Sequence, residues 1–270
     1  MKKLVTGILV LFLLVGCTTK QHNGKKTLRV GMECNYAPFN WTQIESSDTA
    51  VLIAGGNAGY CDGYDVAIAR LLASELDYDL VIKKIEWDGL PIAIANDEID
   101  LIIAGMTDTE DRRVSLDFTT PYYVSDMVLI VRADSRYAKA KSIQDFAGAR
   151  VVAQLNTFHD DIIDQITGVI HETPMKTFPL MTVAVQSKAV DAMVSELPVA
   201  ISIVSSNPDL IYLLFSPENN FAAGEDATVS IALRKGNAEL FALIQAALDK
   251  ISPAQRTALM SAAQLRVPEE

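Results

Sequence analysis

Short β-branched runs alternate with amphipathic stretches along most of this chain, and this alternation limits the fold more than any other feature. Residues 28–33, 79–85 and 100–105 have the composition of strands. Between them, Asp65 and Asp88 are candidate N-caps of helices whose apolar positions recur at helical spacing. The order strand, helix, strand, helix, strand predicts βαβ units around a parallel sheet.

The same alternation starts again after the apolar run 128–133. Residues 150–154 and 191–195 are predicted strands, each followed by a predicted helix at 158–166 and 197–204. A polar, turn-rich run follows at 216–226, and a strand is predicted at 229–234. Two helices come last, one from Asn237 and one from Ser252, which is a predicted N-cap. The sequence therefore predicts an α/β fold with two successive units.

Composition agrees with a globular protein. The chain has 270 residues, of which 50% are hydrophobic and 21% charged, so it holds enough apolar side chains for real cores. Its length predicts one large or two modest domains. The formal net charge of -11 argues against a nucleic-acid partner, because neutralising phosphates requires clustered Lys and Arg.

The N-terminus has the pattern of a secretory signal. Lys2 and Lys3 precede an apolar run at 8–15 that is too short for a membrane-spanning helix. The four residues LVGC that end at Cys17 resemble the lipobox of bacterial lipoproteins, which implies a signal peptide at 1–16 and lipid on Cys17. Residues 17–27 are then a flexible tether. We expect an extracytoplasmic protein that a lipid anchors to the cell membrane; the alternative is a buried N-terminal helix.

Two further cysteines, Cys34 and Cys61, lie 27 residues apart in the N-terminal region. Outside the cytoplasm such a pair can oxidise, so a disulfide between them is one hypothesis. It would contribute roughly 3 kcal/mol by restricting the unfolded chain. Two buried free thiols are the alternative, because the sequence does not give the distance between their Cα atoms.

Ligands of parallel α/β sheets bind beyond the carboxyl ends of the strands. Around the predicted strand ends of both units the chain carries an arginine, hydroxyls, carboxylates, an amide, aromatic rings and a flexible backbone position. These residues are Glu33, Tyr36, Trp87, Gly105, Met106, Thr107, Arg112, Asn156, Thr157 and Glu196. This set of groups is suited to a small zwitterion.

Several segments carry a family resemblance. They are NYAPFNW (35–41), GYDVAIA (63–69), WDGLPIAIANDEIDLIIAGMTDTEDRR (87–113), LDFTTPYY (116–123), QLNT (154–157) and VSELPVA (194–200). In this order they resemble solute-binding protein family 3, the polar amino-acid-binding proteins of ABC importers, over nearly the whole chain after the tether. The segment 87–123 is the most specific.

The resemblance implies a two-lobed periplasmic-binding-protein type II fold with two crossover strands, near 128–133 and 216–227. Lobe 1 would comprise 28–128 plus 228–270, and lobe 2 would comprise 129–227 with the hinge strands. A hinge motion would close the lobes over a free amino acid. The implied partners are ABC permease subunits, and the protein is expected to be a monomer without cofactor or metal.

The resemblance also assigns roles at the carboxylate end of the ligand. Arg112 matches the arginine that grips the α-carboxylate, and a guanidinium suits this role because it offers two parallel donors. Thr107 and Thr157 match donors to the same carboxylate from opposite lobes. Taken alone, Arg112 would be read as a surface arginine and either threonine as a helix cap.

At the other end, Glu196 stands where the family usually has an aspartate that receives the α-ammonium, and its extra methylene changes the distance. Its alternative is a carboxylate at a helix start that the helix dipole favours. Gly105 matches a backbone carbonyl that meets the same ammonium. Tyr36 and Trp87 match aromatic rings that sandwich the side-chain stem, where core packing is the alternative for each ring alone.

Glu33 is the candidate specificity residue. Relatives that bind basic ligands or glutamine have an acidic group there, and a carboxylate would repel an acidic ligand, so we expect a polar or basic amino acid, arginine or glutamine first. A surface glutamate at a strand end is the alternative. Asn156 replaces the usual Gly or Ser beside the threonine. The insertion 43–59 has no assigned role.

Two other functions stay open. A prephenate-type dehydratase can share this fold, and a buried glutamate can act as an acid or base. A membrane-tethered sensor can share it too. However, the sequence contains no nucleophile motif, phosphate loop or metal-ligand spacing. We expect His159, near a helix start, to be a solvated surface residue.

Overall fold

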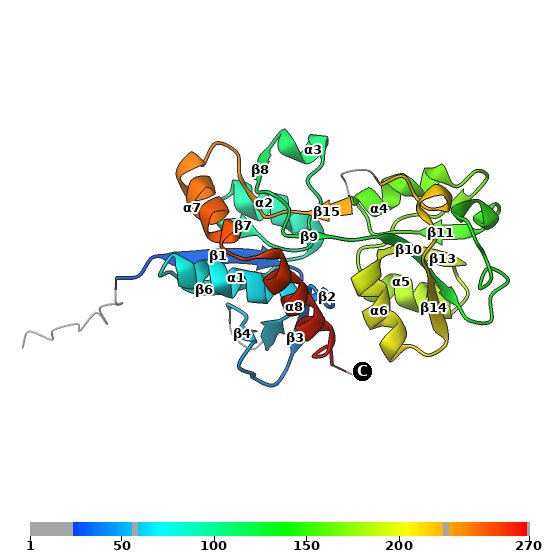
Figure 1. Ribbon diagram of the computed structural model, residues 1–270, viewed down its shortest axis with the longest axis horizontal. Coiled ribbons are helices and arrows are strands. Elements are labelled where there is room, and N and C mark those ends of the chain that lie inside the picture. The colour runs from blue at the N-terminus through cyan, green and yellow to red at the C-terminus, as the bar shows by residue number, and fades with distance from the viewer. Residues whose placement is uncertain (1–23, 56–58, 224–226, 269–270) are drawn as a thin grey trace, which may run out of the picture.

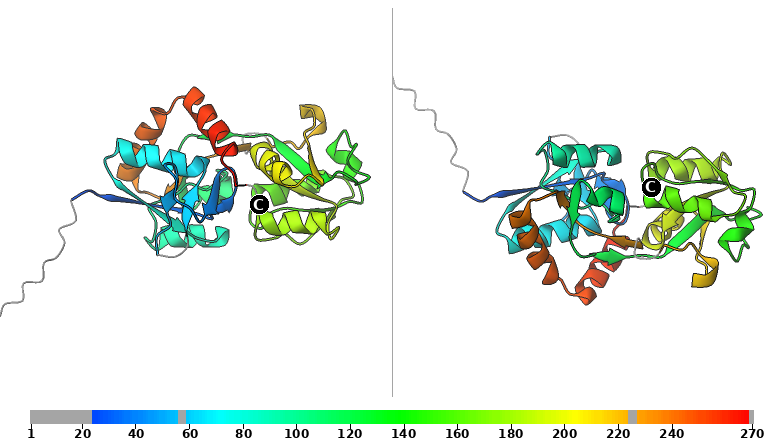
Figure 2. Two further views of the ribbon diagram at one scale, coloured as in Figure 1. Left: turned by 90° about the horizontal axis from the view of Figure 1, so that it is seen from below. Right: turned by 90° about the horizontal axis from the view of Figure 1, so that it is seen from above.

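A computed structural model describes residues 24–55, 59–223 and 227–268. The predicted signal peptide 1–16, Cys17 and the tether up to residue 23 lie outside the described residues. The two predicted α/β units form two lobes that lie side by side (Figures 1 and 2). Among the described residues, no helix is long and apolar enough to cross a membrane.

The first lobe contains a five-stranded sheet in the order β6-β1-β7-β16-β8. β1 (Thr27–Met32) runs parallel to β6 (Asp79–Lys84) and β7 (Leu101–Ile102). β16 (Ala232–Arg234) returns antiparallel and pairs with β8 (Leu116–Phe118). The helical segments are α1 (Tyr64–Glu75), η1 (Trp87–Gly89), α2 (Leu90–Ala95), α3 (Glu110–Arg113), α7 (Ala238–Asp249) and α8 (Pro253–Gln264). The parallel strands confirm the predicted βαβ core.

The second lobe contains a five-stranded sheet in the order β12-β11-β13-β10-β14. These strands are β10 (Met127–Arg132), β11 (Arg150–Val152), β12 (Ile170–His171), β13 (Ala192–Glu196) and β14 (Leu210–Leu213). Its helical segments are η2 (Ile143–Phe146), α4 (Phe158–Asp161), η3 (Ile162–Gln165), α5 (Phe178–Gln186), α6 (Leu197–Ser206) and η4 (Pro217–Asn219). The strands predicted at 150–154 and 191–195 are confirmed as β11 and β13.

Two strands between the lobes pair with each other. β9 (Tyr123–Val124) and β15 (Thr228–Val229) form a two-stranded antiparallel sheet that lies between the larger sheets (Figure 1). The position predicted for the first crossover, near 128–133, was wrong, because that segment is β10 within the second sheet. Its apolar residues alternate between two cores, with Val128 and Ile130 in one and Leu129 in the other, as a buried strand requires. The second crossover, predicted near 216–227, is β15, just after that range.

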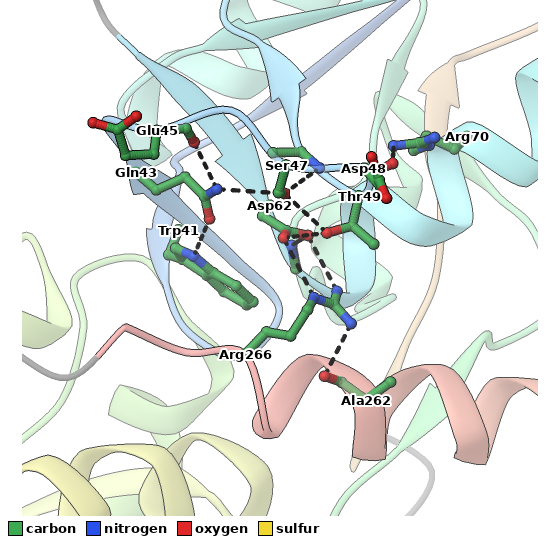
Figure 3. A network of polar contacts seen from close by, with 12 residues as sticks. Trp41, Gln43, Glu45, Ser47, Asp48, Thr49, Asp62, Arg70, Ala262 and Arg266 are labelled. Carbon is green, nitrogen blue, oxygen red and sulfur yellow. Dashed lines mark hydrogen bonds and ion pairs between the residues drawn. The ribbon is translucent and has the colours of Figure 1, made fainter.

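The described part of the insertion 43–59, residues 43–55 and 59, contributes to a small side sheet on the first lobe. This sheet has the order β2-β3-β5-β4, with β2 (Asn35–Tyr36), β3 (Asn40–Gln43), β4 (Val51–Leu52) and β5 (Tyr60–Asp62). The buried carboxylate of Asp62 accepts from Thr49 (2.6 Å) and pairs with Arg266 (3.2 Å), beyond the end of α8 (Figure 3). The insertion is therefore attached to the C-terminal part of the chain.

A disulfide joins Cys34, just before β2, to Cys61 in β5, with Cα atoms 5.7 Å apart. The Cα separation lies within the range that a disulfide can span. The bond fastens the side sheet to the loop that follows β1.

The N-caps of the last two helices are the polar residues at which the sequence predicts these helices to begin. Ser252 makes the predicted capping box with Gln255, and Asn237 caps α7. The predicted caps at Asp65 and Asp88 were wrong. Gly63 precedes α1 and Gly89 precedes α2, while the two aspartates make the longer-range contacts described below.

Candidate functional site

The loops that follow β1, β6, β7 and β11 meet between the lobes around one small cavity. Its lining comes from both lobes and consists of Glu33, Tyr36, Trp87, Ala104, Gly105, Thr107, Arg112, Gln154, Thr157 and His159. Glu196 and Asn156 contact these residues directly. Met106, a predicted site residue, is instead buried in the apolar core of the first lobe and does not line the cavity.

Glu33 extends from the end of β1 into the boundary between the lobes and is 3% exposed. The side-chain amide of Gln154 donates to both of its carboxylate oxygens, each at 3.3 Å. Burial raises the pKa of Glu33 to about 7, although the Gln154 amide opposes this shift. A cationic or amide group of a ligand would supply the stronger pairing that this carboxylate lacks.

Glu196, at the end of β13, is a second buried carboxylate in the site. The Tyr36 hydroxyl donates to its Oε1 at 3.1 Å, and His159 Nε2 lies 3.6 Å from the same atom. Glu196 Oε2 and His159 Nδ1 are buried and have no hydrogen-bond partner in the described part of the chain. The expectation that His159 is solvated was wrong, since it is 6% exposed. Buried polar atoms are normally hydrogen-bonded, so these two atoms are available to a ligand.

Arg112, in α3, places its guanidinium beside the indole of Trp87, with Cζ 5.2 Å from the ring centroid. Its Nη1 donates to the Thr107 carbonyl at 2.6 Å. Burial lowers the pKa of Arg112 to about 10, so the group remains cationic at neutral pH. A guanidinium has five N–H donors, which leaves donors for a ligand carboxylate.

Asn156 joins the two lobes through both its backbone and its side chain. Its carbonyl accepts from Arg112 Nη2 (2.9 Å) and from Trp87 Nε1 (3.3 Å). Its side-chain amide donates to Asp88 Oδ1 at 2.8 Å. Asp88 does not cap α2 because it lies inside η1, one residue before Gly89. Asn156 has φ of 57°, a left-handed conformation that asparagine adopts more readily than most residues.

The predicted hydroxyl and backbone groups complete the lining. The Thr157 hydroxyl donates to the Gln154 carbonyl at 2.6 Å, at the start of α4. Gly105 has φ of 60°, and a Cβ there would lie 2.8 Å from a ring carbon of Tyr36. Only glycine therefore allows the Tyr36 ring to lie this close to the backbone.

The cavity volume is about 10 Å³, roughly the space that one water molecule needs. An amino acid cannot enter while the contacts between Tyr36 and Glu196 and between Asn156 and Arg112 hold the lobes together. Binding therefore requires the lobes or these side chains to separate first.

The charges of the site favour a zwitterion. One guanidinium and two carboxylates face the same small volume, and burying such charges is costly unless each is paired. The described residues contain no group of three or more His, Cys, Asp or Glu side chains placed to hold a metal ion.

Comparisons with known proteins identify the family of this chain. The sequence model of the bacterial extracellular solute-binding proteins, family 3, matches residues 28–262. The chain belongs to this family. The family and the relatives described below are named as solute-binding proteins, so the comparisons identify this chain as a solute-binding protein and do not support the dehydratase alternative.

Among the relatives of this solute-binding protein, a probable histidine-binding protein of Campylobacter jejuni is 29% identical over 222 residues, which cover 78% of this chain and 80% of the relative. The arginine-binding extracellular protein ArtP of Bacillus subtilis is 27% identical over 238 residues, which cover 86% and 85%.

Solved structures share the two-lobed α/β fold. AbpA of Streptococcus pneumoniae, an amino acid ABC transporter substrate-binding protein bound to L-arginine, has a TM-score of 0.74 at 25% identity and covers 88% of this chain and 94% of its own. An ancestral arginine-binding protein bound to glutamine has a TM-score of 0.73 at 27% identity and covers 88% and 97%. These matches confirm the predicted fold class.

Sequence reasoning missed Ala104, Gln154 and His159 in the lining, and Phe178, which packs against Tyr36. Gln154 follows β11 directly, and the strand-end rule that selected Asn156 could have found it. His159 lies two residues after Thr157, but nothing near it in the sequence distinguishes it from a surface histidine. Phe178, whose ring centroid lies 4.7 Å from that of Tyr36, reaches the site by packing between distant segments, and nothing local in the sequence indicates this.

Proposed function

We propose that this solute-binding protein captures a polar or basic free amino acid, with arginine or glutamine favoured. The observation that carries the proposal is the charge pattern of the cavity. Arg112 would receive the α-carboxylate, Glu196 with its unpartnered oxygen would receive the α-ammonium, and Glu33 would pair with the side chain. Arginine supplies all three complementary groups.

The known ligands of relatives support this class. One related structure holds arginine and another holds glutamine. Histidine is the next candidate, because a relative is named as a probable histidine-binding protein. A ligand carboxylate beside Glu33 would be repelled, so aspartate and glutamate are disfavoured.

We further propose a cycle of capture and delivery. The ligand would dock on the first lobe, and the second lobe would close over it by bending at the paired strands β9 and β15. The closed monomer would pass the ligand to ABC permease subunits. Lipid on Cys17 would keep the protein beside them at the membrane.

Calorimetric titration of the chain from residue 24 with arginine, glutamine, histidine, cystine, leucine and glutamate tests the proposal. We expect arginine or glutamine to bind most tightly. Glu33→Gln should weaken arginine about tenfold or more and glutamine less, because only arginine loses an ion pair. Glu86→Gln, an exposed carboxylate nearby, is the matched control and should change neither affinity more than about twofold. Tight binding of leucine, with none of the polar amino acids binding, would refute the proposal.

A further inference from the structure

Asp65 is a fully buried carboxylate that does not line the cavity. It lies in the first turn of α1, but its side chain turns into the first lobe. Its Oδ1 accepts from the Tyr122 hydroxyl at 2.7 Å, and its Oδ2 accepts from the Asn40 side-chain amide at 2.8 Å. Each of these two partners in turn binds one backbone N–H group of the candidate site.

The first chain of hydrogen bonds ends at Gly105. The backbone N–H of Gly105 donates to the Tyr122 hydroxyl oxygen at 3.0 Å. This bond fixes the peptide plane between Ala104 and Gly105, both of which line the cavity. Because glycine has few steric restraints of its own, an external hydrogen bond is what holds its backbone in one orientation.

The second chain ends at the loop after β1. The backbone N–H of Cys34 donates to the Asn40 side-chain oxygen at 2.7 Å. Cys34 has φ of 52°, an unusual conformation for a residue with a side chain. This turn directs Glu33 and Tyr36, on either side of it, toward the cavity.

The chemistry of a carboxylate explains why one residue can control both chains. An ionised carboxylate only accepts hydrogen bonds, so it orients the Tyr122 proton and the Asn40 amide toward itself. The Tyr122 oxygen is then free to accept from Gly105, and the Asn40 carbonyl to accept from Cys34. Chains of this kind strengthen cooperatively in a buried setting.

We propose that Asp65 is a positioning residue that aligns the Gly105 backbone and the Glu33–Tyr36 loop as a single preformed half of the binding site. This inference rests on the proposed function, because it assumes that these groups receive the ammonium and side chain of an amino acid. Asp65 would then act on affinity without touching the ligand.

Tyr122→Phe and Tyr64→Phe form a matched pair that tests the first chain. Both remove a buried tyrosine hydroxyl from the same aromatic cluster. The Tyr64 hydroxyl, however, donates only to the Tyr122 carbonyl (2.8 Å) and not to Asp65 or Gly105. Tyr122→Phe should lose more stability, because its hydroxyl makes two hydrogen bonds and one of them is to a carboxylate. Only Tyr122→Phe should change binding.

The binding probes are L-arginine and its analogue without the α-amino group, 5-guanidinopentanoate, measured at pH 8. Burial raises the pKa of Asp65 to about 7, so it is mostly ionised at this pH. Tyr122→Phe should weaken arginine about tenfold and the analogue less than threefold, because the Gly105 backbone serves the ammonium. Tyr64→Phe should change both less than threefold. Equal losses for both probes in Tyr122→Phe would overturn the inference.

Amide hydrogen exchange gives a readout that needs no ligand. In Tyr122→Phe the Gly105 amide should exchange at least tenfold faster while the Cys34 amide keeps its protection, and Asn40→Leu should reverse this pattern. In Asp65→Asn only one acceptor oxygen remains, so at least one of the two amides should lose protection. Unchanged exchange at Gly105 in Tyr122→Phe, or at both amides in Asp65→Asn, would overturn the inference, whereas failure of wild-type protein to bind any amino acid would overturn only the proposed function.

Discussion

The hydroxyl of Tyr36 on the first lobe donates to Glu196 on the second lobe across 3.1 Å, while the other oxygen of Glu196 has no partner in the described residues. One carboxylate thus closes the site with one oxygen and offers the other to a ligand. The Glu196 carboxylate, which we propose receives the ammonium, also joins the two lobes. Ligand binding and lobe closure therefore depend on the same group.

Glu196→Gln should weaken arginine binding by about 2–4 kcal/mol, because it removes one charge of a desolvated pair while keeping the volume and one acceptor oxygen. The melting temperature of the ligand-free protein should fall little or rise, since the substitution also removes an unpaired buried charge. Calorimetric titration and thermal unfolding measure the two effects. Unchanged arginine affinity would contradict the role of Glu196.

Arg112→Ala should weaken binding by about 2–5 kcal/mol, since it leaves the ligand carboxylate buried without its cation. Arg112→Lys is the informative companion, because lysine keeps the charge but lacks two parallel donors. We expect Arg112→Lys to fall between wild type and Arg112→Ala in calorimetric titration. Near-normal affinity in Arg112→Ala would show that the carboxylate binds elsewhere.

Glu33 should make stability depend on pH. Its folded-state pKa is raised to about 7 from an ordinary 4.5, chiefly by burial, so the unfolded chain ionises first as pH rises. Stability should therefore fall between about pH 4.5 and 7 by roughly 3 kcal/mol from this group. Glu33→Gln should remove this part of the decline in urea unfolding at pH 5 and pH 8. Asp65, raised to about 7 by burial in the same way, leaves a decline of the same sign in the variant.

The disulfide between Cys34 and Cys61 should stabilise the first lobe. Replacing both cysteines by serine should lower the free energy of unfolding by roughly 3 kcal/mol, the value expected for closing a loop of this length. Reduction of the wild-type protein before urea unfolding is the control and should give a loss of similar size. A double variant as stable as the oxidised protein would mean that the bond contributes nothing in solution.

The periodic elements could be predicted from the sequence because their signals are local. α7 and α8 begin at polar caps with helical spacing behind them, and β11 and β13 are short, mostly buried runs. The prediction that Asp65 caps α1 was wrong because the N-cap is set by the backbone conformation just before the helix. The residue before α1 is Gly63, with φ of 133°, and Asp65 lies within the first turn, where it can serve the core.

The candidate site was predictable where it follows strand ends and unpredictable where distant packing forms it. Trp87 and Thr107 lie where the carboxyl-end rule places them. By contrast, the burial of His159 depends on Glu196 and on the ring of Phe178, whose centroid lies 6.2 Å from its own. These partners are remote in sequence, so no pattern near His159 distinguishes it from a surface histidine.

The side chain of Asn156 should act as a latch between the lobes, because its amide donates to Asp88 across the boundary at 2.8 Å. Asn156→Gly removes only this side-chain bond, since glycine readily keeps the left-handed backbone and the carbonyl that Arg112 and Trp87 use. We expect Asn156→Gly and Asp88→Ala each to weaken arginine binding by about 0.5–1.5 kcal/mol, the usual contribution of one hydrogen bond. The double variant should lose no more than either single variant, because both remove the same contact. Additive losses in calorimetric titration would show that the two residues act separately and that the latch does not exist.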